Sequence, residues 1–300
     1  MPIKETNNYI INNIKTVIYS NSFNSLIKRE RLSKKQNSTV IGIGGSHIYF
    51  SKLSGLKIER THKERINFKD KDKFFENIIY KYNEEKFQNK NTIVIFSYPF
   101  RAYRKDTIID GIYKKNTEVT KVIPFKDDTF NLSDKLNSNF NIVNDAVAVN
   151  LYNIYKYSGY DIYISAISGT GVNIAYTQDN LVINSEYGNI QIPKDIISLT
   201  NIFSNSTFES VIAENSLRKI SKIKDIDYKY LKKISAKIFA LSIVSFISDY
   251  KSASVLFQGS FICKDKEYRD RVISIIKANY KGHIHIDYDN LSDIKGASLI

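Results

Sequence analysis

The feature that most constrains the fold is a pair of glycine turns, each placed between two apolar strands. Residues 39–43 (TVIGI) predict a strand that enters the turn Gly44-Gly45-Ser46, and a second apolar strand follows the turn. Residues 162–167 (IYISAI) repeat the pattern and enter the turn Ser168-Gly169-Thr170-Gly171. Such turns expose backbone N–H groups that a phosphate can approach, although a single one is often only a tight hairpin. Two of them in corresponding places favour a nucleotide phosphate chain held between two related halves.

The order of the remaining segments predicts an α/β protein. Helical spacing of apolar residues appears at 71–82, 146–157, 208–220 and 228–250. Apolar strands are expected at 92–96, 140–143 and 254–257, and each ends in small or polar residues. We therefore expect two lobes, each with a mixed sheet flanked by helices, and a cleft between them in which strand ends bind the ligand. The predicted boundaries are a helical segment at 1–37, a small lobe at 38–142 and a large lobe at 143–300.

The amino-acid composition limits the cellular location and the binding partners that we expect for this protein. The single cysteine, Cys263, excludes an internal disulfide and a multi-thiolate zinc site, so we expect a cytoplasmic protein. The longest apolar stretch, 238–247, is about half the length of a membrane span and predicts a buried helix. The net charge of +13 would suit a polyanion, and a basic nucleic-acid-binding protein stays as a rival interpretation. Most lysines lie beside acids or asparagines, however, which favours a solvated surface.

Polar residues at strand ends supply candidates for catalysis and binding. Asp145 follows Asn144 after the strand 140–143, where a carboxylate can accept a hydroxyl proton; it can equally cap the helix that follows. Glu186 and Glu209 could each bind vicinal hydroxyl groups or act as helix caps. His283 and His285 have the spacing of two metal ligands, but no third ligand accompanies them, so no metal site is predicted.

Taken together, the motifs resemble the eukaryotic-type hexokinase and glucokinase family of the sugar kinase, heat-shock protein and actin superfamily. The likeness begins near residue 38, and its parts follow in the family's order: IGIGGSHIYF, FSYPFR, Thr120-Lys121, VNDAVAVNLY, SGTGVNIAY, NSEYGN, FESVIAENSLRKI, LFQGSFICKDKEYRDRV and KGASL. The resemblance implies the two-lobed actin-like ATPase (ribonuclease H-like) fold.

The resemblance also implies roles for individual residues. The sugar-binding residues would be Ser97, Thr120, Lys121, Asn144, Asp145, Asn173, Glu186 and Glu209. Asp145 would be the general base on the hexose 6-hydroxyl, and Lys121 would supply positive charge near the transferring phosphoryl group. ATP phosphates, accompanied by Mg²⁺, would lie on Gly44, Gly45 and Ser46 and on Gly169, Thr170 and Gly171. Gly259 and Ser260 would face the adenosine.

The chain departs from the family pattern in three places. Gly42 stands where the first phosphate motif normally has an aspartate that helps to hold Mg²⁺, Tyr49 stands where the motif has an arginine, and the closing helix is short. These departures leave two interpretations of function. One is an ATP-dependent hexokinase acting on glucose or a related hexose at the first step of glycolysis; the other is a catalytically impaired sugar sensor or scaffold. We favour the hexokinase because Asp145, Lys121 and both glycine turns are present. The sequence makes no prediction of oligomeric state.

Overall fold

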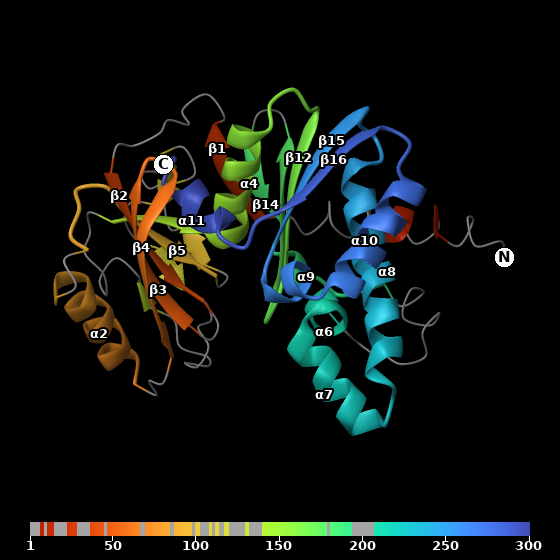
Figure 1. Ribbon diagram of the computed structural model, residues 1–300, viewed down its shortest axis with the longest axis horizontal. Helices are drawn as coiled ribbons and strands as arrows, with labels where there is room; N and C mark the ends of the chain where they lie inside the picture. The colour runs from red at the N-terminus through yellow and green to blue at the C-terminus, as the bar shows by residue number, and fades with distance from the viewer. Residues whose placement is uncertain are drawn as a thin grey trace. The chain divides into compact units, whose positions relative to one another are not determined.

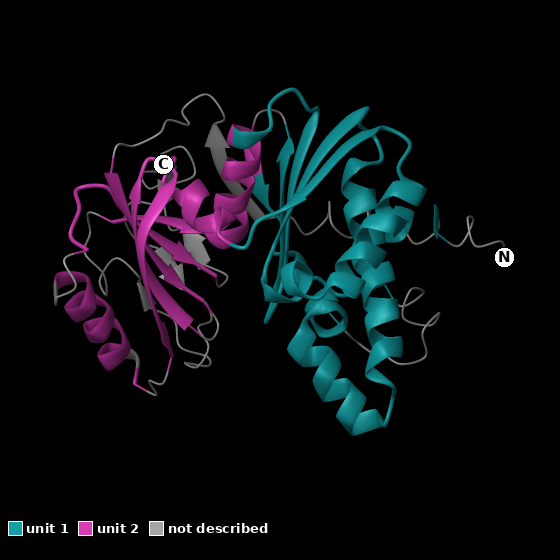
Figure 2. Cartoon of the chain, viewed as in Figure 1, with its two compact units in different colours: residues 1–24, 156–179, 183–290 teal, residues 25–155, 180–182, 291–300 magenta. Residues whose placement is uncertain are grey.

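A computed structural model describes residues 37–44, 47–66, 70–84, 87–97, 140–178, 181–193 and 207–300, with short segments at 7–8, 11–14, 23–28, 100–102, 108–109, 112–113, 117–119 and 130–131 (Figure 1). The chain forms two compact units (Figure 2). Unit 1 comprises residues 1–24, 156–179 and 183–290, and unit 2 comprises residues 25–155, 180–182 and 291–300.

Unit 2 is built on a mixed seven-stranded sheet with the order β4-β3-β2-β5-β11-β8-β7. Its strands are β2 (Asn37–Ile43), β3 (His47–Ser54), β4 (Lys57–Arg65), β5 (Thr92–Phe96), β7 (Ile108–Ile109), β8 (Ile112–Tyr113) and β11 (Asn141–Asn144). A smaller sheet has the order β10 (Phe130–Asn131), β9 (Thr117–Val119) and β6 (Phe100–Ala102). Helix α2 (Lys71–Glu84) lies on one side of the large sheet, and α4 (Asp145–Lys156) and α11 (Ser292–Ala297) lie on the other (Figure 1).

The alternation of side chains along β2 and β3 explains this arrangement. Ile41, Ile43 and Phe50 belong to a buried cluster that also contains Phe74 and Phe75 of α2. Successive strand residues point to opposite faces, so Gly42 and Tyr49 face away from α2. Burial of each large aromatic or branched side chain on the two faces of the sheet adds roughly 1.5–3 kcal/mol to the free energy of unfolding.

Unit 1 contains most of a six-stranded sheet with the order β1-β14-β13-β12-β15-β16, of which residues 25–28 and 181–182 are assigned to unit 2. Its strands are β1 (Phe23–Lys28), β12 (Ile162–Ser168), β13 (Val172–Gln178), β14 (Leu181–Asn184), β15 (Ser252–Gln258) and β16 (His283–Tyr288). Its helices are α6 (Phe208–Ile212), α7 (Glu214–Lys224), α8 (Tyr228–Ile247), α9 (Ser260–Lys264), α10 (Lys266–Asn279) and the 3₁₀ turn η2 (Tyr187–Asn189).

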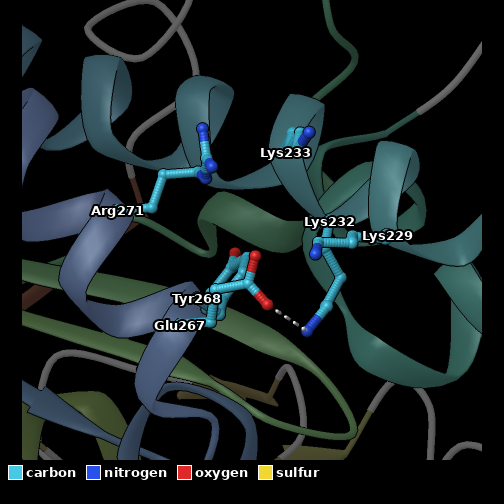
Figure 3. A pocket seen from close by; sticks show the side chains of 6 residues that line it. All are labelled: Lys229, Lys232, Lys233, Glu267, Tyr268 and Arg271. Atoms are coloured by element: carbon cyan, nitrogen blue, oxygen red, sulfur yellow. Dashed lines mark ion pairs between the residues drawn. The ribbon is translucent and has the colours of Figure 1, made fainter.

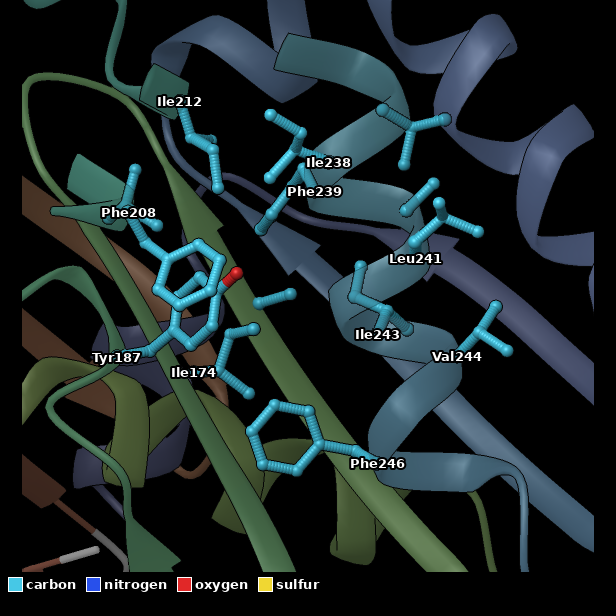
Figure 4. Close-up of a cluster of buried hydrophobic side chains, with 14 of the residues drawn as sticks. Ile174, Tyr187, Phe208, Ile212, Ile238, Phe239, Leu241, Ile243, Val244 and Phe246 are labelled. Carbon is cyan, nitrogen blue, oxygen red and sulfur yellow. The ribbon is translucent and has the colours of Figure 1, made fainter. Parts of the chain in front are cut away.

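The apolar stretch 238–247 forms the buried half of α8, as predicted. Its residues pack into a core in which Tyr187 stacks on Phe208, with ring centroids 4.3 Å apart (Figure 4). The Tyr187 hydroxyl donates a hydrogen bond to Ser242 of α8, so the buried phenol is not left unpaired. Among the described residues no helix is both long and apolar enough to cross a membrane.

The predicted α/β fold with two mixed sheets flanked by helices is confirmed, and both glycine turns join antiparallel strands. Two local expectations are wrong. The predicted helix at 208–220 is divided into α6 and α7 at Ala213, whose ψ of 134° is extended. Residues 23–28 are predicted to belong to a helix and a link, but they form strand β1. This strand pairs with β14 in the six-stranded sheet, and that pairing outweighs the helical spacing of apolar residues in the N-terminal segment. The predicted lobe boundaries and the cleft remain predictions.

Candidate functional site

Three neighbouring parallel strands of unit 2 end in one row. In the register of the sheet Ile43 lies opposite Phe96, and Phe96 lies opposite Asn144. The next residues are Gly44, Ser97 and Asp145, so these predicted site residues come together at the carboxyl edge of the sheet. The Ser97 N–H donates to the Ile43 carbonyl at 3.1 Å, which holds adjacent strand ends together, and the residue is exposed.

Asp145 is the first residue of α4, and Asn144 directly precedes the helix. The Ala146 N–H donates to Asp145 Oδ1 at 2.7 Å and to Asn144 Oδ1 at 2.9 Å. Asn144, directly before the helix, accepts from the second N–H of α4, so the capping position belongs to Asn144 and Asp145 lies inside the first turn. The general-base interpretation of Asp145 remains a prediction. The positive end of a helix dipole stabilises an ionised carboxylate, which is the form that accepts a proton.

Tyr49 fills the space beside Gly42 and reaches Asp293 of α11. A Cβ atom added to Gly42 would lie 1.8 Å from Cζ of Tyr49, its cross-strand partner. The Tyr49 hydroxyl donates to Asp293 Oδ2 at 2.5 Å. Burial raises the pKa of Tyr49 well above its ordinary value, and the Asp293 and Asp145 carboxylates raise it further, so the phenol keeps its proton.

The two sequence departures at this place thus form a single packing feature. No carboxylate of β2 faces this space, and the described residues contain no group of three His, Cys, Asp or Glu side chains arranged to hold a metal ion. The residues of the first turn that the structure describes do not fit a Mg²⁺ ion held by protein side chains.

Asn173, Asn184 and Glu186 form a hydrogen-bonded chain in unit 1. Asn173 Nδ2 donates to Asn184 Oδ1 at 3.0 Å, and Asn184 Nδ2 donates to Glu186 Oε1 at 2.6 Å. Asn189 Nδ2 donates to the other Glu186 oxygen at 3.3 Å. Asn173 Oδ1 is fixed by the N–H groups of Ile174 and Tyr187, at 2.8 and 3.2 Å. The amides are therefore oriented before any ligand arrives.

Glu209 brings a second carboxylate to the same place. Its Oε2 lies 3.2 Å from where a Cβ of Gly171 would stand and 3.3 Å from that of Gly188. Burial raises the pKa of Glu186; the hydrogen bonds from Asn184 and Asn189 lower it, and the Glu209 carboxylate raises it. Glu186 also has a left-handed backbone, with φ 46°, which is strained for a residue other than glycine.

This arrangement suits a ligand rich in hydroxyl groups. Two partly desolvated carboxylates are costly side by side unless hydrogen-bond donors compensate them. Hydroxyl groups donate to carboxylates and to amide oxygens and accept from amide N–H groups. The structure therefore brings together Asn173, Glu186 and Glu209, three of the residues that the resemblance implies as sugar-binding, and that role remains a prediction.

The second glycine turn lies against the segment predicted to face adenosine. Gly259 has φ 104°, and a Cβ there would lie 2.5 Å from the Ser168 carbonyl oxygen. A Cβ on Gly169 would lie 3.4 Å from the Ser260 N atom. The Gly169 carbonyl accepts from the Glu214 N–H at 3.2 Å, which ties the turn to α7. Two glycine-containing segments thus meet closely here, and the contact includes main-chain atoms of Ser168 and Ser260 together with the Ser260 hydroxyl group. Backbone N–H groups and a hydroxyl group are suited to phosphate oxygens, as the predicted ATP site requires.

The predicted site residues divide between the two units, and four of them lie outside the part of the chain that the structure describes. Gly45, Ser46, Thr120 and Lys121 lie outside the described residues. Gly44, Ser97, Asn144 and Asp145 belong to unit 2, whereas Asn173, Glu186, Glu209, the second glycine turn (Gly169, Thr170, Gly171), Gly259 and Ser260 belong to unit 1. The convergence of both sets on one ligand remains a prediction.

The sequence analysis overlooked two groups of the site. Asn184 stands two residues before Glu186 in the same motif, and that spacing could have revealed it. Asp293 carries no local signal, because it meets Tyr49 only through the folding of α11 onto the sheet.

The histidines of β16 lie among aromatic rings. The rings of His285 and Tyr157 have centroids 4.1 Å apart, and those of His283 and Tyr160 are stacked at 5.7 Å. Both histidines therefore pack against tyrosine rings, and Nε2 of His285 is buried without a hydrogen-bond partner among the described residues.

A small pocket between α8 and α10 also lies in unit 1, and none of the predicted site residues lines it (Figure 3). Its lining residues are Lys229, Lys232, Lys233, Glu267, Tyr268 and Arg271. Lys232 forms an ion pair with Asp265 at 2.8 Å and with Glu267 at 3.9 Å, so part of its positive charge is neutralised within the protein.

Comparison with known proteins gives a fold but no sequence family. No family model matches the chain, and no curated protein matches it. The fold is similar to hexokinase from Schistosoma mansoni complexed with glucose, with a TM-score of 0.65, 12% identity, and coverage of 98% of this chain and 94% of that one. It is similar to a ROK family glucokinase from Streptomyces griseus in complex with glucose and AMPPNP, with a TM-score of 0.62, 14% identity, and coverage of 87% and 98%.

A ROK hexokinase from Thermus thermophilus is similar as well, with a TM-score of 0.62, 12% identity, and coverage of 88% of this chain and 97% of that one. Because the similar structures include both ROK proteins and a hexokinase, they do not single out the eukaryotic-type hexokinase family that the motifs resemble. The chain has the actin-like ATPase fold of the sugar kinases.

Proposed function

We propose that the protein is an ATP-dependent sugar kinase that phosphorylates the 6-hydroxyl of a hexose, with glucose as the first candidate. The observation that carries this proposal is the group formed by Asn173, Glu186 and Glu209 beside the second glycine turn. Oriented amides and paired carboxylates are suited to a polyhydroxylated ring, and a ring lacking one hydroxyl would leave a polar group unpaired.

Asp145 is the proposed general base. It stands at the sheet edge beside Ser97 and Asn144, and the helix dipole of α4 favours its ionised form. It would accept the proton of the 6-hydroxyl as that oxygen attacks the terminal phosphorus of ATP. Lys121 is proposed to neutralise charge on the transferring phosphoryl group. Gly44, Gly45 and Ser46, with Gly169, Thr170, Gly171, Gly259 and Ser260, are proposed to hold ATP.

Two comparisons support this proposal without deciding the substrate. The hexokinase structure holds glucose, and the ROK glucokinase structure holds glucose and AMPPNP. Since both are less than 25% identical to this chain, their ligands identify compounds to test. We propose a cytoplasmic protein with a role in carbohydrate metabolism.

The decisive experiment combines binding and turnover. Calorimetric titration with glucose, mannose and fructose is followed by a coupled assay for ADP and hexose 6-phosphate, with ATP and Mg²⁺ present. We expect binding and phosphorylation of at least one hexose, and loss of about 10²-fold or more in kcat for Asp145→Asn with the hexose Kd nearly unchanged. Hexose binding without phosphorylation would reject the kinase and leave a sugar-binding protein. No binding of any hexose would reject both.

A further inference from the structure

Helix α11 touches three separate parts of unit 2. Asp293 accepts the hydrogen bond from Tyr49 of β3, and Ser298 Oγ donates to the Gly55 carbonyl at 3.4 Å, in the turn between β3 and β4. On its other side α11 meets α4, because a Cβ on Gly296 would lie 1.7 Å from the Ala148 carbonyl oxygen. The helix thus connects the β2–β3–β4 strands to α4.

The contact with α4 lies within one turn of the proposed base. Ala148 is three residues after Asp145, the first residue of the helix. The Lys295 ammonium group lies over the Tyr152 ring, 5.3 Å from its centroid, one helical turn further along. Because the backbones of α11 and α4 are in direct contact at Gly296, a shift of α11 must move the start of α4 or open a gap.

The contact with β3 leads back to the first glycine turn. Tyr49 is two residues after His47, which begins β3 directly after that turn, and its ring lies on Gly42, two residues before Gly44. The hydroxyl group joins this hairpin to Asp293, and Tyr49 is electrostatically coupled to Asp145. One phenol therefore joins the hairpin that contains Gly44 to α11, and α11 in turn contacts the helix that carries the proposed base.

We propose that Tyr49 and Asp293 are positioning residues that set the place of Asp145 relative to Gly44, the described residue of the first glycine turn. This inference rests on the proposed function for its catalytic consequence, since the turn would hold the phosphoryl donor and Asp145 would accept the proton. A displacement of about 1 Å between reacting groups can cost on the order of 10²-fold in rate.

The test uses Tyr49→Phe, Asp293→Asn and the double variant. Phenylalanine keeps the ring on Gly42 and removes only the hydroxyl group. Tyr82→Phe is the matched control, because the Tyr82 hydroxyl also bonds within unit 2, to Thr92 Oγ1 at 2.9 Å, at the opposite end of β5 from Ser97. Each protein is measured for melting temperature, kcat, hexose Kd and hydrogen–deuterium exchange of peptides covering residues 140–152.

Tyr49→Phe and Asp293→Asn should each lower kcat by about tenfold or more and change the hexose Kd by less than about twofold. Exchange at the start of α4 should accelerate, and the double variant should be no worse than the worse single variant, because both remove one hydrogen bond. Tyr82→Phe should lower the melting temperature without changing kcat or the exchange of this peptide.

The inference is overturned if Tyr49→Phe and Tyr82→Phe behave alike in kcat and exchange, or if the effects of the two single variants simply add. If the wild-type protein phosphorylates no hexose, the proposed function fails on that result alone. Exchange at residues 140–152 then still decides whether Tyr49 and Asp293 control the start of α4.

Discussion

The ring of Tyr49 occupies the space in which any side chain on Gly42 would have to lie. A Cβ at residue 42 would stand 1.8 Å from Cζ and 2.2 Å from both Cε atoms of Tyr49. The two residues are direct partners in the β2–β3 pair, so the Tyr49 ring can leave this space only if its side chain rotates away and gives up the hydrogen bond to Asp293. The glycine and the tyrosine are therefore parts of one packing arrangement, and replacing either affects the other.

Gly42→Asp alone should destabilise the protein by about 3 kcal/mol or more, because it forces a charged side chain into space filled by the Tyr49 ring. In the Gly42→Asp/Tyr49→Ala double variant the space is free, so the loss should be clearly smaller than the sum of the two single losses. Chemical denaturation of the four proteins gives this coupling. Additive losses would contradict the steric account.

The same geometry changes how a restored aspartate should be tested for activity. Gly42→Asp in the presence of Tyr49 would report a packing defect, whatever the metal requirement of the site. Only the double variant, compared with Tyr49→Ala, separates the effect of the carboxylate from the effect of the clash.

Glu186→Gln should make the protein more stable at neutral pH and weaken hexose binding. The pKa of Glu186 is raised in the folded protein, with burial as the main cause, so its ionisation opposes folding at pH values above that raised pKa. Below the ordinary glutamate pKa of 4.5 the carboxyl group is protonated in both the folded and the unfolded protein, and the gain should disappear. Melting temperatures of the wild-type and variant proteins, measured from about pH 4 to about pH 8, test this predicted pH dependence of the stability gain. A gain that grows as the pH falls would contradict it.

Asn184→Ala should reduce hexose affinity by about tenfold, because it removes the amide that joins Asn173 to Glu186. Asn189→Ala is the matched control. Its amide also donates to Glu186, but over 3.3 Å and from an exposed residue, so its effect should be much smaller. Calorimetric titration measures both, and equal losses would show that the chain from Asn173 to Glu186 has no special role.

Gly259→Ala should impair ATP binding and lower stability, since alanine would add strain at φ 104° and press a Cβ to 2.5 Å from the Ser168 carbonyl. Gly159→Ala separates these two causes. Gly159 has φ 91° but no atom within 4 Å of its Cβ position, so this variant carries only the backbone strain. We expect a loss of about 1 kcal/mol for Gly159→Ala and at least twice that for Gly259→Ala. Equal losses would mean that the contact with Ser168 is unimportant.

The sequence pattern correctly predicted those helices and strands whose burial can be read from the residues of the element itself. The strand at 162–167 and the buried half of α8 are covered on every side, and nearly all of their residues are apolar, so their sequences show the burial directly. The sequence analysis did not predict the break at Ala213, which depends on how α6 and α7 pack against each other. It also did not predict strand β1, which forms by pairing with β14, a strand far away in the sequence.

The same distinction applies to the candidate site. Motif order alone pointed to Asn173, Glu186, Glu209 and Asp145, because the type of each residue and its place at a strand end or helix start are local properties of the chain. Only the tertiary structure decided that Glu186 and Glu209 share one electrostatic environment, that Asn184 joins two site residues, and that Tyr49 lies on Gly42 and binds Asp293. The physical reason is that contact, burial and charge coupling depend on distances between residues far apart in sequence, and these distances exist only after the sheets and helices have packed.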